Sequence, residues 1–116
     1  MIVGIGLDLT EISRIKQAYI KSEKFAKKVL TEKEWFIFND FKGSRQIEFL
    51  AGRFAAKEAF SKALGTGIGK VGFQDIEILN NHYGKPEVTK SPFKGNAFIS
   101  ITHTTAIAAA QVVLET

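Results

Sequence analysis

Two acidic side chains stand at positions in this sequence where packing alone would not place them. Glu58 lies on the apolar face of a long helical pattern, because at about 100° per residue it falls about 20° from Ile47. Asp8 ends a short apolar stretch and precedes a second helical pattern. A buried carboxylate must be paired, protonated or bound to a cation. Because Mg²⁺ binds one or two protein carboxylates together with water and phosphate oxygens, the two residues predict a magnesium site.

Both carboxylates also have a purely structural interpretation. Glu58 and Lys62 are one helical turn apart, which allows an ion pair along the helix. Asp8 and Glu11 could form a capping pair at the start of the next helix. The spacing alone leaves these alternatives open.

Several basic side chains are candidate phosphate contacts if they surround the metal. They are Arg14, Arg53, Lys57, Lys62 and His103. The glycine-rich segment 65–70 also looks like a phosphate-binding loop, but it follows a helix instead of preceding one. A helix C-terminus carries partial negative charge, so we exclude this segment as a phosphate site.

The composition limits both the size of the fold and the class of partner. The chain has 116 residues, is 45% hydrophobic and carries a net charge of +4. This predicts one compact domain, 1–116, with an anionic partner such as nucleic acid, an acidic protein or a phosphorylated small molecule. The absence of cysteine excludes a disulfide framework and a thiolate nucleophile.

Two further predictions rest on missing patterns. No apolar run approaches the roughly 20 residues of a membrane span, so we expect a cytoplasmic protein that does not bind membranes. A small nucleic-acid-binding module is the alternative function, since the chain is basic. It has no support beyond charge, because no RNP-like strand, zinc-finger spacing or helix-turn-helix pattern is found.

The first half of the chain predicts one strand followed by helices. Residues 2–9 form an apolar strand interrupted by Gly4 and Gly6, which favours close approach of another backbone. Thr10 is the expected cap of the helix that follows. Thr31 and Glu34 have the spacing of a capping box, so a second helix should run from there towards Phe41.

The second half predicts a long helix and then strands. The longest periodic segment, 45–64, is apolar on two sides and ends at Gly65, so it should be a central helix packed on both sides. Strands are expected at 73–79, 87–89, 98–102 and 108–114, with a turn at 80–86. The expected fold class is α+β, a single compact domain with the central helix packed on an antiparallel sheet.

Two segments together resemble the signature motifs of a known enzyme family. Gly4–Asp8 followed by Arg14, and Phe54–Ala63, closely resemble the two motifs of bacterial holo-acyl-carrier-protein synthases, the short type of 4′-phosphopantetheinyl transferase. The likeness extends over essentially the whole chain. The order and spacing of the motifs make it specific.

The resemblance implies a set of site residues. Asp8 and Glu58 would bind Mg²⁺, which also contacts the pyrophosphate of coenzyme A. Lys62, His103 and Arg53 would contact phosphates. The nucleotide end of coenzyme A would lie along Gly84, Lys85 and Pro86, and the acyl carrier protein would dock on Arg14, Lys21 and Phe25. The family's short form also implies a homotrimer with sites at subunit interfaces.

The implied reaction belongs to fatty acid biosynthesis and needs mainly positioning and electrostatics. A serine of the carrier protein would attack the β-phosphorus of coenzyme A and expel 3′,5′-ADP, while Mg²⁺ and Lys62 stabilise the charge on the phosphate oxygens. Glu58 and Lys62 are the expected catalytic residues. Either Glu58 or a metal-bound water would accept the serine proton.

Overall fold

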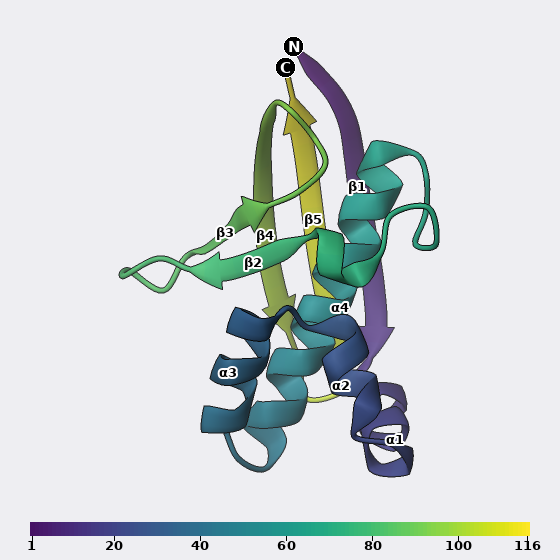
Figure 1. The fold of residues 1–116 in the computed structure, drawn as a ribbon, viewed down its shortest axis with the longest axis vertical. Coiled ribbons are helices and arrows are strands. Elements are labelled where there is room, and N and C mark those ends of the chain that lie inside the picture. The colour runs from purple at the N-terminus through teal and green to yellow at the C-terminus, as the bar shows by residue number, and fades with distance from the viewer.

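The computed structural model describes all of residues 1–116 and has the predicted α+β class, with four helices and antiparallel strands (Figure 1). Its elements in chain order are β1 (Ile2–Glu11), α1 (Ile12–Lys21), α2 (Lys24–Val29), α3 (Glu32–Asp40), α4 (Ser44–Leu64), a 3₁₀ helix (Phe73–Asp75), β2 (Glu77–Asn80), β3 (Pro86–Lys90), β4 (Asn96–His103) and β5 (Ile107–Glu115).

The main sheet is antiparallel, with strand order β1-β5-β4, and α4 lies across it. The first strand touches the helix backbone directly. A Cβ atom added to Gly6 would lie 1.8 Å from the carbonyl oxygen of Ala59, and one added to Gly4 would lie 2.0 Å from that of Ala63. The predicted close approach at these glycines is therefore confirmed, and it brings Asp8 next to α4.

The central helix is buried on most of its circumference, as its two apolar faces predicted. One side packs with β4 and β5, and the other packs with α1, α2 and α3. It ends at Gly65, whose φ of +86° is the left-handed conformation typical of this position. The amides of Gly65, Thr66 and Gly67 all donate to the carbonyl of Ser61. These amides close the helix, which agrees with excluding the loop as a phosphate site.

The three short helices gather at the end of the molecule opposite the chain termini (Figure 1). The capping box at α3 is confirmed, since Thr31 and Glu34 exchange side-chain to backbone hydrogen bonds. The Thr10 cap is wrong: β1 continues to Glu11, and the Thr10 hydroxyl donates to Asp8 instead. The sequence analysis did not predict α2, because this helix is too short to show a clear helical period.

The strands β2 and β3 form a second, two-stranded sheet separate from the main one. The segment predicted as one strand from residue 73 begins instead as the 3₁₀ helix, and β2 starts at Glu77. The hairpin projects away from the rest of the molecule (Figure 1). Its turn is held by Asn81, whose side-chain oxygen accepts from the amides of Tyr83 and Lys85.

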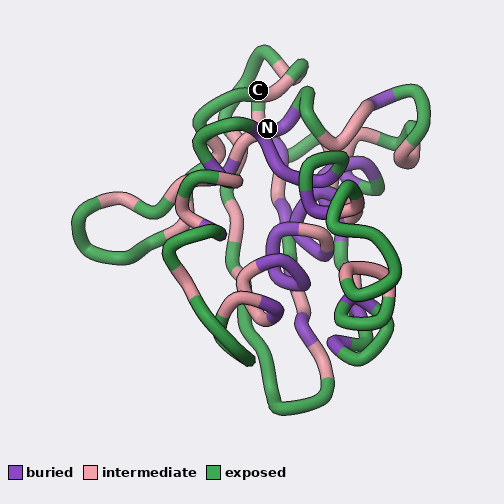
Figure 2. The backbone as a smooth tube through the Cα atoms, turned by 60° about the horizontal axis from the view of Figure 1, so that its bottom comes forward, coloured by how far each residue is buried: buried purple, intermediate pink, exposed green.

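Burial is concentrated where α4 meets its neighbours, whereas the outlying loops are exposed (Figure 2). The outer face of β1 carries apolar side chains that are not buried. Val3, Ile5, Leu7 and Leu9 are each more than half exposed. None of the helices has the length and apolar character needed to cross a lipid bilayer.

Candidate active site

Asp8 and Lys62 meet where β1 crosses α4. The Nζ atom of Lys62 lies 3.2 Å from Oδ1 of Asp8 and also donates to the carbonyl of Leu7 at 3.1 Å. The Thr10 hydroxyl donates to Oδ2 of Asp8 at 2.7 Å. Because Asp8 and Thr10 are two residues apart on a strand, they share the face turned towards the helix. Asp8 is thus held in place on both of its oxygens.

Glu58 lies one turn before Lys62 on α4 and is half-buried. Burial raises the pKa of its carboxyl group, the negative charge of Asp8 raises it further, and the charge of Lys62 works in the opposite direction. The influence of Asp8 means that a second carboxylate lies close enough to act on Glu58. A site that holds two such groups favours a cation between them.

The structure contains neither a Glu58–Lys62 ion pair nor an Asp8–Glu11 capping pair, the two structural alternatives for these carboxylates. Lys62 forms its ion pair with Asp8 on β1, so the pair does not run along the helix to Glu58. Glu11 occupies the cap position of α1 without any side-chain capping bond, so Asp8 and Glu11 are not a capping pair. Nowhere in the chain do three or more His, Asp or Glu side chains cluster as potential metal ligands. The Asp8–Glu58 pair has the oxygen-only donor set that suits Mg²⁺ completed by other oxygens.

A pocket of about 190 Å³ lies on the other side of α4, between the helix, the end of β4 and the base of the hairpin. It brings together Arg53 and His103, two of the predicted phosphate contacts. The remaining lining residues are Phe41, Arg45, Glu48, Phe49, Gly52, Asn80 and Ile101. His103 Nε2 lies 3.7 Å from a carboxylate oxygen of Glu48.

Arg53 is largely engaged within the chain. Its Nε donates to the carbonyl of Ile78 and one Nη donates to the side chain of Asn80, both at 3.1 Å. Its guanidinium group lies 4.4 Å above the ring of Phe49. Burial lowers its pKa, while the charge of Glu34 acts in the opposite direction. Arg53 therefore lines the pocket and also holds the neighbouring strand β2 in place through these hydrogen bonds.

Lys57 is wrong as a phosphate contact. Its ammonium group is fully buried and bound to Glu34 at 2.5 Å and to the carbonyl of Val29 at 2.7 Å. No phosphate reaches it without unpacking the helix. A helical wheel could not distinguish this lysine from a solvated one, because its partner is 23 residues away in the sequence.

The hairpin residues Gly84, Lys85 and Pro86 are not among the residues that line the pocket. Pro86 pairs with the pocket residue Asn80 across the two strands, whereas Gly84 and Lys85 are exposed in the turn. Gly84 has a φ of +85°, which an L side chain rarely adopts. Gly84 and Lys85 are thus exposed to solvent in the turn that precedes β3.

The predicted docking residues share one end of the molecule. Arg14 and Lys21 are exposed on α1, and Phe25 lies half-buried in the first turn of α2. The ring of Phe25 lies 6.0 Å from that of Phe54, so this residue also packs against the helical core.

Three site residues were not identified from the sequence. Thr10 could have been found from the period of two that places it on the same strand face as Asp8. Arg45 and Asn80 carry no local signal. They join Arg53 and His103 only because the fold brings the start of α4 and the end of β2 to one place.

The metal pair and the pocket lie at different edges of the main sheet. Asp8 pairs with Ala110 of β5, and Ala110 pairs in turn with the pocket residue Ile101 of β4. Two strand spacings amount to about 10 Å. Within one chain, α4 and the sheet thus present two separate polar sites.

Comparison with known proteins supplies the family. A family model described as the 4′-phosphopantetheinyl transferase superfamily matches residues 4–113. The holo-[acyl-carrier-protein] synthase of Streptococcus thermophilus is 63% identical over 115 residues, which cover 99% of this chain and 97% of that protein.

Solved structures agree with this relationship. The crystal structure of a holo-(acyl-carrier-protein) synthase from Bacillus anthracis in complex with CoA (3′,5′-ADP) has a TM-score of 0.93 at 51% identity, covering 99% of this chain and 97% of that one. The Helicobacter pylori enzyme in complex with coenzyme A has a TM-score of 0.84 at 34% identity, covering 96% and 99%. With both signature motifs in place around Asp8 and Glu58, this chain belongs to the 4′-phosphopantetheinyl transferase superfamily.

Proposed function

We propose that this chain is a holo-acyl-carrier-protein synthase, which transfers 4′-phosphopantetheine from coenzyme A to a serine of apo-acyl carrier protein. The observation that carries the proposal is the cluster of Asp8, Glu58 and Lys62 where β1 meets α4. Two facing carboxylates beside a cation fit the binding of a metal and a phosphate group. Relatives over the full chain length that bear this enzyme's name support the same activity.

The proposed reaction is a displacement at phosphorus. The serine oxygen forms a bond to the β-phosphorus of coenzyme A, and the bond from that phosphorus to the bridging oxygen breaks. The electron pair of the broken bond leaves with 3′,5′-ADP, and the serine proton passes to a base in the site, for which Glu58 is the candidate. Lys62 lies beside Asp8 and places positive charge where the phosphate oxygens would gather.

Asp8 and Glu58 are the residues that would hold Mg²⁺. When bound there, the ion supplies positive charge that neutralises the phosphate oxygens. The role of Thr10 is to fix the orientation of the Asp8 carboxylate through its hydrogen bond to Oδ2.

We assign the pocket beside His103 to the nucleotide end of coenzyme A. Arg45 and Arg53 supply positive charge for phosphate there, and His103 adds a ring nitrogen that can hydrogen-bond to it. Pro86 pairs with the pocket residue Asn80, and Gly84 and Lys85 precede it in the turn, so we extend the nucleotide site to these three residues. Coenzyme A as co-substrate agrees with the complexes of the Bacillus anthracis and Helicobacter pylori proteins.

The acyl carrier protein would dock on the exposed basic end of the chain. Arg14 and Lys21 on α1 provide charge complementary to an acidic partner, and Phe25 adds a half-exposed aromatic surface. We expect the reaction to take place in the cytoplasm, where it supports fatty acid biosynthesis.

A homotrimer with shared sites is the assembly we propose. The outer face of β1 presents Val3, Ile5, Leu7 and Leu9 to solvent, and Phe98 on β4 is exposed as well. Apolar patches of this kind mark protein contacts. The separation between the metal pair and the nucleotide pocket also suits a substrate that spans two neighbouring copies.

The test of the assembly is the mass of the particle in solution. Light scattering during size-exclusion chromatography should give three times the mass of the chain, and Ile5→Lys together with Leu9→Lys should give a single chain that has lost most transfer activity. A wild-type protein that elutes as a monomer, yet is fully active, contradicts the shared site.

The test of the function is a mass measurement on the carrier protein. The purified chain, coenzyme A, Mg²⁺ and apo-acyl carrier protein should together yield a carrier heavier by one phosphopantetheine group, and omitting any one component should abolish the gain. If several carrier proteins show no gain, the proposed function is wrong. The nucleic-acid-binding alternative is not retained, because the relatives are transferases and no observed feature beyond charge favours it.

A further inference from the structure

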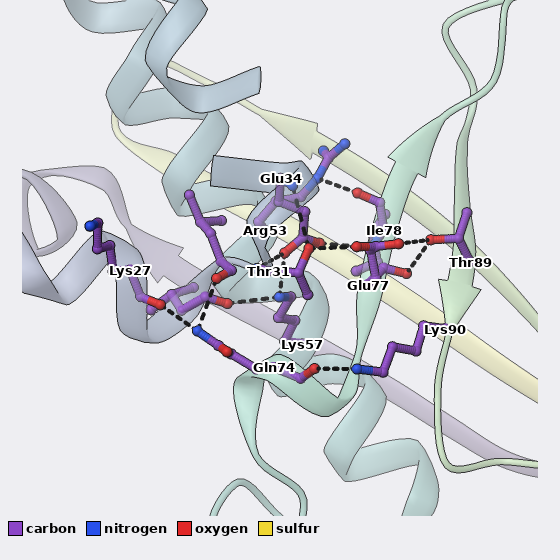
Figure 3. Close-up of polar contacts among 12 residues, drawn as sticks. Lys27, Thr31, Glu34, Arg53, Lys57, Gln74, Glu77, Ile78, Thr89 and Lys90 are labelled. Atoms are coloured by element: carbon purple, nitrogen blue, oxygen red, sulfur yellow. Dashed lines mark hydrogen bonds and ion pairs between the residues drawn. The ribbon is translucent and has the colours of Figure 1, made fainter. Parts of the chain in front are cut away.

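The pair formed by Glu34 and Lys57 is the most buried charged group in the protein. Both side chains have no exposed surface, and Lys57 Nζ lies 2.5 Å from Oε1 of Glu34. The same ammonium donates to the carbonyl of Val29, while Oε1 of Glu34 also accepts the amide of Thr31 at 2.8 Å. Figure 3 shows the pair between α3, α4 and β2. No polar atom of the pair is left without a partner.

The second carboxylate oxygen of Glu34 reaches the hairpin. Oε2 accepts the backbone amide of Ile78 at 2.7 Å, and Arg53 Nε donates to the carbonyl of the same residue at 3.1 Å. Both main-chain polar groups of Ile78 are therefore bound by side chains from the helices. Arg53 extends the contact by one further bond, to the side chain of Asn80.

The hydrogen bonds from Glu34 and Arg53 to Ile78 bind the edge of β2 that has no neighbouring strand. The hairpin β2–β3 is a two-stranded sheet with no ladder to the main sheet, and an isolated hairpin is only marginally stable. Backbone hydrogen bonds normally fix the register of a strand against its neighbour. Here the edge of β2 is held at a defined position along α4 by Glu34 and Arg53 instead.

A buried ion pair is not an efficient way to gain stability, because apolar side chains of similar volume often do as well. Charged hydrogen bonds are directional, however, so they fix one geometry where apolar packing tolerates several. The pair also bears on the proposed nucleotide pocket, because Glu34 holds the strand that ends at the pocket residue Asn80.

We propose that Glu34 and Lys57 are positioning residues that set the β2–β3 hairpin against α4, and so place the nucleotide-binding edge that the hairpin contributes to the site. This inference rests on the function proposed above. Neither side chain touches substrate. Their effect on the reaction passes through Ile78 and the hairpin to the nucleotide end of coenzyme A.

The double variant Glu34→Met with Lys57→Met tests the proposal. It removes both charges while keeping apolar bulk in the core, so the fold should be retained, and it leaves the amide of Ile78 without its carboxylate. The KM for coenzyme A and the Kd for 3′,5′-ADP, measured by calorimetry, should rise about tenfold, as expected when a binding edge is misplaced. The value of kcat at saturating coenzyme A and the Mg²⁺ concentration for half-maximal rate should change less than about twofold.

Gln74→Met is the matched control. The side-chain amide of Gln74 donates to the carbonyls of Lys27 and Leu30 in the same region and bonds neither β2 nor α4. The main-chain carbonyl of Gln74, which accepts from Lys90 of β3, is kept in the variant. Its KM for coenzyme A and Kd for 3′,5′-ADP should match the wild type. A purely stabilising role for the ion pair would leave the folded double variant with wild-type values too, and that result overturns the proposal. A loss confined to kcat or to Mg²⁺ response overturns it as well.

A measurement on the wild-type protein covers the case in which the double variant does not fold. The exchange of the Ile78 amide hydrogen should be slow and should slow further when 3′,5′-ADP is added, because the nucleotide stabilises the hairpin position. An Ile78 exchange rate that does not respond to bound 3′,5′-ADP contradicts the proposal. If the wild type fails to modify any carrier protein, the proposed function itself falls; if it succeeds while these measurements fail, only the inference about Glu34 and Lys57 falls.

Discussion

Lys57 and Glu58 are neighbours on α4, yet they lie in opposite kinds of environment. Lys57 points into the core, where its ammonium group donates to Glu34 and to the carbonyl of Val29. The pKa of Glu58 is raised by burial and by the negative charge of Asp8, a second carboxylate, while the charge of Lys62 lowers it. One charge has all its partners within the chain, and the other faces a group that repels it.

This difference separates structural charges from functional ones. A buried charge whose partners are complete contributes to a single geometry and has nothing left to offer a ligand. Carboxylates brought together without an intervening cation leave binding capacity unused, and clusters of this kind are common at functional sites. The exposure of a side chain alone does not separate the two kinds of charge, because Glu58, the proposed metal ligand, is itself half-buried.

The largest expected effect comes from changing Glu58, the proposed metal ligand. Glu58→Gln keeps the size of the side chain but removes the charge, so transfer should fall by about 100-fold or more. Added Mg²⁺ should raise the melting temperature of the wild type and leave that of the variant unchanged. Steady-state kinetics and thermal unfolding with and without Mg²⁺ measure both effects. Wild-type turnover by the variant contradicts the metal assignment.

Replacing the lysine of each ion pair compares the contributions of the Glu34–Lys57 and Asp8–Lys62 pairs to the free energy of unfolding. Lys57→Met leaves Glu34 charged inside the core, so the free energy of unfolding should fall by about 3–5 kcal/mol. Lys62→Met breaks the pair with Asp8, in which the lysine is half-exposed, and should cost less than about 1 kcal/mol. Urea denaturation of both variants provides the values. Equal losses would show that the two pairs do not differ as described.

The close contact between β1 and α4 can be disturbed without touching either charge cluster. Gly6→Ala introduces a methyl group that would lie 1.8 Å from the carbonyl of Ala59, so the strand must move away from the helix. We expect a loss of about 1–3 kcal/mol in unfolding free energy and a weaker response of the melting temperature to Mg²⁺, since Asp8 moves with the strand. An unchanged Mg²⁺ response combined with lower stability would mean that the spacing of Asp8 and Glu58 is not set by this contact.

The smallest effect concerns Glu77, which adds a further tie between the helices and the hairpin. Burial tends to raise its pKa, but hydrogen bonds from Thr31 and Thr89, followed by the charges of Lys33 and Lys57, lower it below the ordinary value of 4.5. A carboxyl group with a lowered pKa stabilises the fold above pH 4.5, and this contribution is lost as the pH falls through the folded-state pKa.

Glu77→Gln should therefore be modestly less stable than the wild type at pH 7, and the difference should shrink in acid below pH 4.5. Thermal unfolding of both proteins between pH 3 and 7, roughly the range over which carboxyl groups titrate, measures it. A difference that is constant over this range would assign the effect of Glu77 to packing instead of charge.

Local patterns predicted most of the secondary structure. Short-range signals, such as the Thr31–Glu34 capping box and Gly65 after the central helix, were confirmed because the physics behind them acts within one turn of chain. The predictions that were wrong concern residues whose local sequence is compatible with more than one structure. Thr10 had a suitable side chain for a cap but was already engaged with Asp8, and the strand expected from residue 73 began as a 3₁₀ helix.

The sequence by itself determined that Glu58 needed a partner, since a carboxylate on an apolar helix face is anomalous whatever surrounds it. It also determined the family, because the two motifs are segments of contiguous residues. Only the tertiary structure decided which charges meet. Lys62 pairs with Asp8 across 54 positions and Lys57 with Glu34 across 23. Such pairings depend on which elements pack together, and no periodicity within a single helix or strand contains that information.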